Sequence, residues 1–144
     1  MKNFTRFFAG AKAFALVLIL TLTLVPCAWG ASYLSYGVPF TANAPRGWSY
    51  KKDGEAHIFY SQGYQEFINV TGTGSGGRSL KQFAAKEAES QGAELQQWDY
   101  GYMCVTPNGD EIYFWGSKNS FLFVLCHGDS DELVELFNSI QLRQ

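Results

Sequence analysis

The sequence groups imidazole and carboxylate side chains within six residues near its C-terminal end. His127, Asp129 and Asp131 are spaced two apart, and Glu132 follows. This spacing fits neither an EF-hand loop nor a zinc motif. Acidic side chains at such a position also favour the first turn of a helix through the helix dipole. His127, Asp129 and Asp131 are therefore the candidate metal ligands, but the helical interpretation is preferred and no metal is predicted.

A nucleophile paired with a base would indicate covalent catalysis. Cys126 directly precedes His127, but adjacent residues of a strand point to opposite faces, so these side chains are not expected to meet. His57, the other histidine, lies near a predicted hairpin and is expected at the surface. No pair of acids stands out for glycoside hydrolysis. We predict no catalytic residue and a protein that is not an enzyme, with a hydrolase of unrecognised site as an alternative.

Gly72–Gly77 contains the G-x-G-x-x-G pattern of dinucleotide-binding loops, between a predicted strand and a predicted helix. The preceding strand alternates polar and apolar residues, whereas a parallel central strand is usually a continuous apolar run. Antiparallel strands are predicted to follow, without the crossover that a dinucleotide-binding fold needs. We therefore predict a connecting loop and no cofactor.

Aromatic residues make up 17% of the chain. If residues 95–106 form one strand, Trp98, Tyr100 and Tyr102 share one of its faces. Tyrosine and tryptophan favour contact sites that are half exposed to water. The three side chains are therefore a candidate ligand or partner surface, with a core covered on both faces as the simpler interpretation. An open groove beside them would make the protein a small-ligand carrier, the second alternative.

Cys104 and Cys126 are the cysteines that follow the N-terminal region. An oxidising compartment would favour a disulfide between them. A turn at residues 107–109 predicts that Cys104 faces Ile112 and that Cys126 points to the opposite face. Bridged cysteines need Cα atoms within about 7 Å, which this register does not provide. The compartment and the register disagree, so the disulfide stays open.

The hydrophobic periodicity predicts short strands up to Thr71, including a hairpin at Asp53-Gly54, and a first helix that begins at Ser79. Three further strands and a closing helix follow. Ser79 with Gln82, and Asp129 with Glu132, have capping-box spacing. The order βββ-α-βββ-α with short links requires antiparallel pairing. We predict an α+β fold, an antiparallel sheet with helices packed on it.

Residues 1–30 have the three-part order of a secretory signal peptide. Basic residues precede the apolar run Ala13–Val25, and small residues allow cleavage at Gly30/Ala31. The run is shorter than the 18–20 residues or so that a membrane-spanning helix needs. Pro26 disfavours a lipoprotein box, and hence an anchor at Cys27. We predict a periplasmic or secreted protein with no membrane span in its mature chain.

After cleavage, residues 31–37 are expected to form a lead-in segment and residues 38–144 a single domain. This mature chain has eight Lys and Arg against thirteen Asp and Glu, a net charge of −5. It carries no basic stripe, so no nucleic-acid partner is predicted. The expected partner is another exported or envelope protein.

The segment Phe40–Trp48, with its ending Pro45-Arg46-Gly47-Trp48, resembles the opening of the PsbP-like superfamily, which includes the bacterial DcrB-type periplasmic proteins. The helix start at Ser79-Leu80 and the ending Phe137-Asn138-Ser139-Ile140 also fit this family. The resemblance covers most of residues 38–142. It implies an α/β/α sandwich with helices on both faces of an antiparallel sheet, and a non-enzymatic binding or assembly role. The leading hypothesis is an exported binding or accessory domain that acts through protein contacts.

Overall fold

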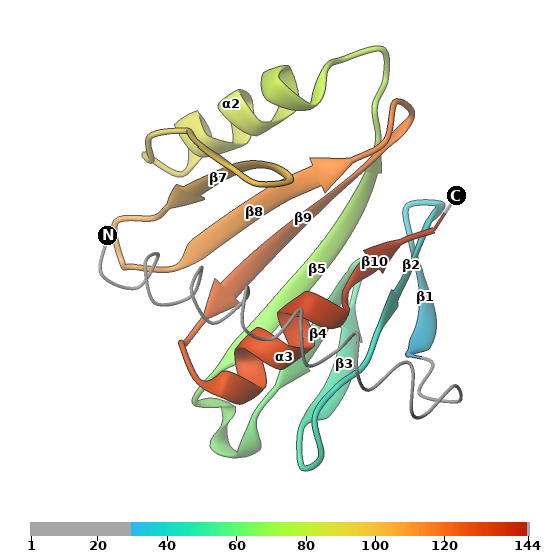
Figure 1. The fold of residues 1–144 in the computed structure, drawn as a ribbon, viewed down its shortest axis with the longest axis vertical. Helices are drawn as coiled ribbons and strands as arrows, with labels where there is room; N and C mark the ends of the chain where they lie inside the picture. Colours follow the sequence, from blue (N-terminus) through green and yellow to red (C-terminus); the bar gives the residue numbers. More distant parts are fainter. Residues whose placement is uncertain (1–29, 144) are drawn as a thin grey trace.

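Two antiparallel sheets organise the computed structural model, which describes residues 30–143 (Figure 1). The larger sheet has the strand order β3-β4-β5-β9-β8-β7-β6, and the smaller sheet has the order β1-β2-β10. The predicted signal peptide and its cleavage site fall almost wholly outside the described residues. The elements in chain order are β1 (Ala31–Ser35), β2 (Val38–Ala42), β3 (Ser49–Asp53), β4 (Ala56–Tyr60), the 3-10 turn η1 (Gln62–Tyr64), β5 (Phe67–Gly74), α2 (Leu80–Ser90), β6 (Gln96–Trp98), β7 (Gly101–Val105), β8 (Glu111–Gly116), β9 (Ser120–His127), α3 (Asp131–Ser139) and β10 (Gln141–Leu142).

The predicted α/β/α sandwich with the order βββ-α-βββ-α is wrong. Within residues 30–143, five strands precede α2, four separate it from α3, and one follows α3. The physical reason is the size of the sheet. Seven strands at a spacing of about 4.8 Å span about 29 Å, whereas the eleven residues of α2 extend only about 16 Å. One short helix cannot cover a face of this sheet.

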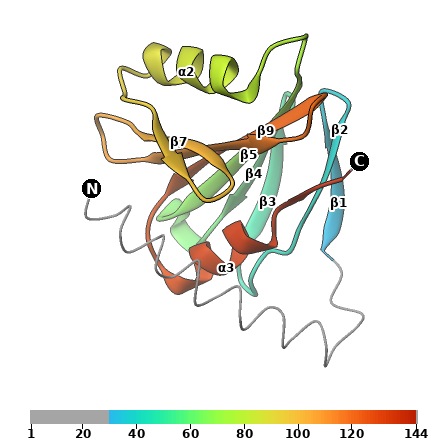
Figure 2. The same cartoon turned by 45° about the horizontal axis from the view of Figure 1, so that its top comes forward.

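The smaller sheet covers the part of one face that α3 leaves open (Figure 2). Phe40 of β2 is fully buried, and it shares a core with Phe59 of β4 and Leu136 of α3. Alternation along β2 directs Val38, Phe40 and Ala42 into this core. The protein is therefore closed on this side by a sheet and a helix together.

The opposite face has its own core beneath α2. Phe83, Ala84 and Ala88 of α2 pack on a cluster that includes Phe114 of β8 and Phe121 of β9. The start of α2 follows the predicted capping box: the backbone N–H of Gln82 donates to Ser79 Oγ at 3.1 Å, and Ser79 N–H donates to Gln82 Oε1 at 2.9 Å. In Figure 2, α2 lies over β7 and leaves β3 at the far end of the sheet uncovered.

Residues 31–37, expected as a lead-in segment, form β1 and a tight turn into β2. Tyr36 and Gly37 both have positive φ, 46° and 77°, as a two-residue hairpin turn of this hand requires. Ser35 attaches this hairpin to the larger sheet. Its hydroxyl donates to the carbonyl of Glu55 at 2.6 Å and accepts from the backbone N–H of Gly72 at 2.9 Å.

Strand pairing inside the larger sheet confirms the predicted register. Cys104 faces Ile112, and Phe114 lies between Tyr102 and Phe123. The predicted hairpin at Asp53-Gly54 is also present, because β3 pairs with β4 across a two-residue turn. The predicted cap at Asp129 is wrong: Ser130 caps α3 and accepts from the backbone N–H of Leu133 at 3.2 Å. Neither helix described by the structure is long and apolar enough to cross a membrane.

Candidate functional site

The predicted surface of Trp98, Tyr100 and Tyr102 is divided by a turn, so the prediction that they share one face is wrong. Residues 95–106 form two strands, and Trp98 at the end of β6 pairs with Gly101 at the start of β7. Trp98 belongs to the α3 side of the sheet and Tyr102 to the α2 side, while Tyr100 is exposed in the turn between them. These three side chains therefore do not line one groove.

Gly101 explains how β7 can lie so close to β8 directly after this turn. A Cβ atom at this position would lie 2.1 Å from the carbonyl oxygen of Phe114, so β7 can approach β8 only with glycine. The same turn brings Trp98 against Tyr113 and Phe137, with ring centroids 5.0 and 5.8 Å apart. Trp98 is therefore mainly part of the aromatic packing around α3.

Cys104 and Cys126 are free and buried on opposite faces of the sheet. Burial raises the pKa of the Cys104 thiol to about 11, with a smaller contribution from the charge of Glu87. Burial also raises the pKa of Cys126. Both thiols are thus held in the protonated, unreactive form. The open disulfide question is answered by the register, which places the sheet between the two sulfur atoms.

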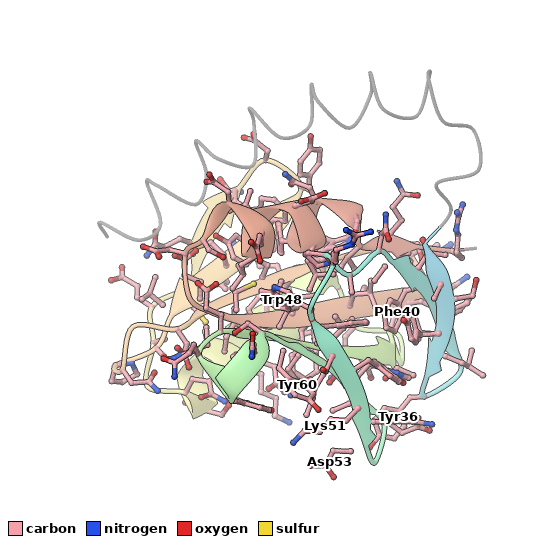
Figure 3. All side chains as sticks on the ribbon, turned by 90° about the horizontal axis from the view of Figure 1, so that it is seen from below. Tyr36, Phe40, Trp48, Lys51, Asp53 and Tyr60 are labelled. Atoms are coloured by element: carbon pink, nitrogen blue, oxygen red, sulfur yellow. The ribbon has the colours of Figure 1, made fainter. Side chains whose placement is uncertain are left out.

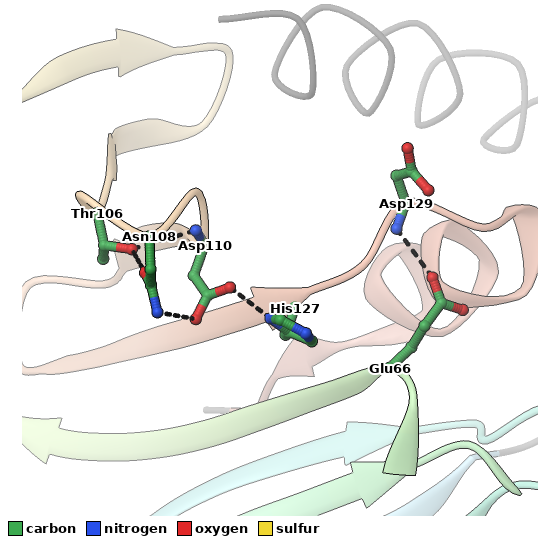
Figure 4. Close-up of polar contacts among 6 residues, drawn as sticks. All are labelled: Glu66, Thr106, Asn108, Asp110, His127 and Asp129. Atoms are coloured by element: carbon green, nitrogen blue, oxygen red, sulfur yellow. Dashed lines mark hydrogen bonds and ion pairs between the residues drawn. The ribbon is translucent and has the colours of Figure 1, made fainter. Parts of the chain in front are cut away.

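His127, Asp129 and Asp131 do not converge on one point. His127 Nδ1 contacts Asp110 Oδ1 at 2.6 Å (Figure 4). The backbone N–H of Asp129 instead donates to Glu66 Oε2 at 2.9 Å, and Asp131 lies in the first turn of α3. No group of three metal-type ligands is present among the described residues.

Asp110, which the sequence reading did not single out, orients His127. The side-chain amide of Asn108 lies 3.5 Å from Asp110 Oδ2, the second carboxylate oxygen. The backbone N–H of Asp110 donates to Thr106 Oγ1 at 3.1 Å. The imidazole also stacks on Phe67, with ring centroids 5.1 Å apart. Because a carboxylate accepts the hydrogen bond, Nδ1 donates it, and Nε2 is the ring nitrogen left for another partner. No hydroxyl or thiol of residues 30–143 hydrogen-bonds to this Nε2, so a base is oriented without a nucleophile.

His57 is 3% exposed, so its predicted surface position is wrong. Its Nε2 lies 2.9 Å from the carbonyl oxygen of Leu34, and its Nδ1 lies 2.7 Å from the hydroxyl of Tyr50. Since a carbonyl can only accept, Nε2 donates to Leu34 and Nδ1 accepts from Tyr50. Both nitrogens are occupied in joining β1 to the β3–β4 hairpin. His57 is therefore a structural residue.

Glu111 is buried in the core at 3% exposure, and the hydroxyl of Tyr113 donates to its Oε2. Burial raises the pKa of Glu111 above its ordinary value of 4.5; the Tyr113 hydrogen bond opposes this shift, and the charge of Asp129 adds to it. The folded state therefore binds a proton more tightly than the unfolded chain. Its stability must fall as the pH rises from about 4.5 through the folded-state pKa.

Glu111→Gln is expected to remove this loss of folding stability at higher pH, because glutamine stays neutral at every pH. The measurement is urea unfolding of both proteins from about pH 4 to about pH 8. The free energy of unfolding of the wild type should fall more steeply over this range than that of the variant. Glu94→Gln, at an exposed position, is the control and should follow the wild type. Parallel curves for wild type and Glu111→Gln would contradict the prediction.

The outer edge of the larger sheet at β3 is its least covered part. All five residues of β3 are exposed, and no strand within residues 30–143 pairs with its outer side. Five large apolar side chains are exposed in the described part of the chain. Four of them, Leu34, Tyr36, Tyr50 and Tyr64, lie on or beside β3 and the β3–β4 hairpin.

We call these four residues, together with Lys51 and Lys52, the β3 edge surface. Figure 3 shows Tyr36, Lys51 and Tyr60 gathered around β3. Tyr36 belongs here because the β1–β2 hairpin is bonded to Glu55 through Ser35. Both Tyr36 (66% exposed) and Tyr64 (41% exposed) have positive φ, 46° and 57°. Tyr36 takes this conformation in the β1–β2 turn and Tyr64 at the end of η1, so both side chains are carried by tight turns.

The lysines of the β3 edge surface point to opposite faces of the sheet, as consecutive strand residues must. Lys51 Nζ lies 4.9 Å from the ring centroid of Tyr64, which itself stacks on Tyr60 at 4.8 Å. Lys52 Nζ lies 3.5 Å from a carboxylate oxygen of Glu55. Lys51 therefore presents its positive charge on one face beside tyrosine rings, whereas the charge of Lys52 on the other face is paired with Glu55.

The backbone of β3 also offers unpaired groups. Residue pairs in an antiparallel ladder alternate between hydrogen-bonded and non-bonded. Asp53 and Ala56 flank the two-residue turn, where the closing pair is hydrogen-bonded. Tyr50 and Lys52 consequently direct their N–H and C=O groups away from β4. Sequence reasoning missed this site, although the run Ser-Tyr-Lys-Lys-Asp, which has no buried alternation, is typical of an edge strand.

No protein-family model matches this chain, and no curated protein matches it. Among solved structures, it is similar to a crystal structure from Bacteroides thetaiotaomicron VPI-5482 determined at 1.50 Å resolution, with a TM-score of 0.50 and 19% sequence identity. The match covers 80% of this chain and 49% of that chain, so this chain spans about half the length of that protein. At this identity the likeness concerns the fold alone. The resemblance to the PsbP-like superfamily stays a prediction.

Proposed function

We propose that this protein is an exported, non-enzymatic binding or accessory domain that acts through protein contacts, and that the β3 edge surface is its contact site. The occupant is an extended segment of another exported or envelope protein, which adds to β3 as a further strand. One observation carries the proposal. The strand that is exposed along its whole length is also the strand around which four of the five exposed large apolar side chains of the described region gather.

The chemistry of this surface supports strand addition. The outward N–H and C=O groups of Tyr50 and Lys52 supply main-chain hydrogen bonds, and the neighbouring tyrosines supply contact area on both faces. Tyrosine is enriched at protein interfaces because it buries a large ring and keeps a polar tip. The export of the chain rests on the signal-peptide pattern of residues 1–30.

The test is site-specific photocrosslinking in cells that express the full chain. A benzophenone amino acid replaces Tyr50 in one variant and Tyr100 in a second. Tyr100 is the control, because it is also exposed but lies at the other edge of the sheet. We expect a heterologous protein adduct from position 50 and none from position 100. Equal adducts at both positions, no adduct at position 50, or an adduct with a second copy of this chain would overturn the proposal.

A matched pair of variants tests whether the backbone of β3 takes part. Lys52→Pro and Lys52→Thr both remove the charge, but only proline removes the N–H that points away from β4. Proline is tolerated on an edge strand at such a position. In the photocrosslinking background at Tyr50, Lys52→Pro is expected to abolish the adduct and Lys52→Thr to retain a reduced amount of it. Equal yields from the two variants would show that the contact is not strand addition.

A further inference from the structure

We infer that the segment received by β3 is acidic, with two consecutive carboxylate residues that lie opposite Lys51 and Lys52. This inference rests on the proposed function, since it names the chemistry of the partner at the same edge. It starts from the charges of β3, where Lys51 and Lys52 outweigh Asp53 and give the strand a net charge of +1 on a chain whose net charge is negative. Lys51 and Lys52 are adjacent, so they place one ammonium group on each face of the sheet.

An added strand continues the alternation of β3. A residue opposite Lys51 points to the face of Tyr64, and a residue opposite Lys52 points to the face of Tyr50. Opposite charges directly across two strands stabilise their pairing, and like charges destabilise it. Two consecutive acidic residues would therefore meet Lys51 on one face and, on the other face, share Lys52 with Glu55, its ion-pair partner within the hairpin. An apolar residue that follows them would lie opposite Tyr50, because antiparallel strands run in opposite directions.

The lysines also argue against a second copy of this chain as the occupant. Symmetric antiparallel pairing of two β3 strands about Lys51 places Lys51 opposite its own copy, and the like charges repel. Lysine on an edge strand is a common protection against self-association. The position of the Lys51 side chain strengthens this repulsion between two copies. Lys51 is held over the ring of Tyr64, so its ammonium group is already positioned on its face before a partner arrives.

Peptide titration followed by amide chemical shifts tests the inference. The probes are acetyl-Thr-Glu-Glu-Val-Thr-amide and its neutral counterpart acetyl-Thr-Gln-Gln-Val-Thr-amide, added to the full exported chain. We expect the acidic peptide to bind about fivefold more tightly, since two cross-strand charge pairs contribute. The largest shifts should fall on the amides of Tyr50 and Lys52. Raising the salt concentration should reduce the difference between the peptides, because the charges are exposed.

Variants separate this inference from the proposed function. In Lys51→Glu/Lys52→Glu, the preference should reverse in favour of acetyl-Thr-Lys-Lys-Val-Thr-amide. In Lys52→Pro, binding of every peptide should be lost. If the acidic and neutral peptides bind equally and Lys52→Pro still abolishes both, strand addition stands and the acidic partner is refuted. If no peptide shifts the β3 amides, the acidic partner is also refuted, and the photocrosslinks alone decide the proposed function.

Discussion

Replacement of Phe114 by alanine is expected to lower the free energy of unfolding by about 3 to 5 kcal/mol. Phe114 is fully buried in β8. Its ring meets Phe83 of α2 edge-on, with centroids 5.9 Å apart, and lies 6.4 Å from Phe123 of β9. The neighbouring strands hold the backbone of β8 on both sides, so the structure can close only part of the cavity. Urea unfolding followed by tryptophan fluorescence measures the loss.

Tyr100→Ala provides the matched control for Phe114→Ala. Tyr100 is an aromatic residue of the same sheet, but its side chain is 74% exposed in the turn between β6 and β7. Its replacement should change the free energy of unfolding by no more than about 0.5 kcal/mol. A loss below about 1 kcal/mol for Phe114→Ala would mean that α2 does not pack on the sheet as the structure shows.

Phe40→Ala should cost a similar amount, about 3 to 5 kcal/mol, because the smaller sheet is part of the core. Phe40 is fully buried in β2. Its ring stacks on Tyr33 of β1 at 5.2 Å and meets His57 of β4 edge-on at 5.3 Å. Alanine would therefore remove contacts that join the two sheets. Thermal unfolding should show a single transition at a lower temperature for this variant.

Leu34→Ala is the control for Phe40→Ala, since Leu34 lies on the neighbouring strand β1 but is 57% exposed. This change should leave the unfolding temperature nearly unaltered. If Phe40→Ala is as mild as Leu34→Ala, the smaller sheet does not seal the core. A substitution of Gly72 would test the same contact between the two sheets, because a Cβ atom at this position of β5 would lie 2.7 Å from Val38 Cβ of β2.

Local pairing could be predicted from the sequence, because it depends on neighbouring residues. The Asp53-Gly54 signal predicted the β3–β4 hairpin, whose two turn residues are Gly54 and Glu55, and the Pro107-Asn108-Gly109 turn set the register that opposes Cys104 to Ile112. That register correctly separated the two cysteines. The same reasoning failed for Trp98, because a turn at Asp99-Tyr100 changed which face each side chain occupies. One unrecognised turn is enough to move an aromatic residue across a sheet.

The distribution of layers could not be predicted in the same way. Residues 31–35 and 141–142 are short and unremarkable as sequence, and they become strands only by pairing with β2 from both sides. The covering of Phe40 then depends on where this small sheet settles against β4 and β5. Such contacts join residues distant in the chain, so periodicity within one segment carries no information about them.

The β3 edge surface shows the division between sequence and tertiary structure most directly. The sequence by itself determined that a hairpin turns beside Asp53-Gly54, with a tyrosine and two adjacent lysines just before the turn. Only the tertiary structure decided that this arm is the last strand of the sheet. The next strand, β5, pairs with β4 and not with β3, and no other described strand pairs with the outer side of β3. The tertiary structure also brought Tyr36 and Tyr64 beside it from separate turns. Exposure of a strand is a property of its neighbours, and the neighbours here are set by long-range pairing.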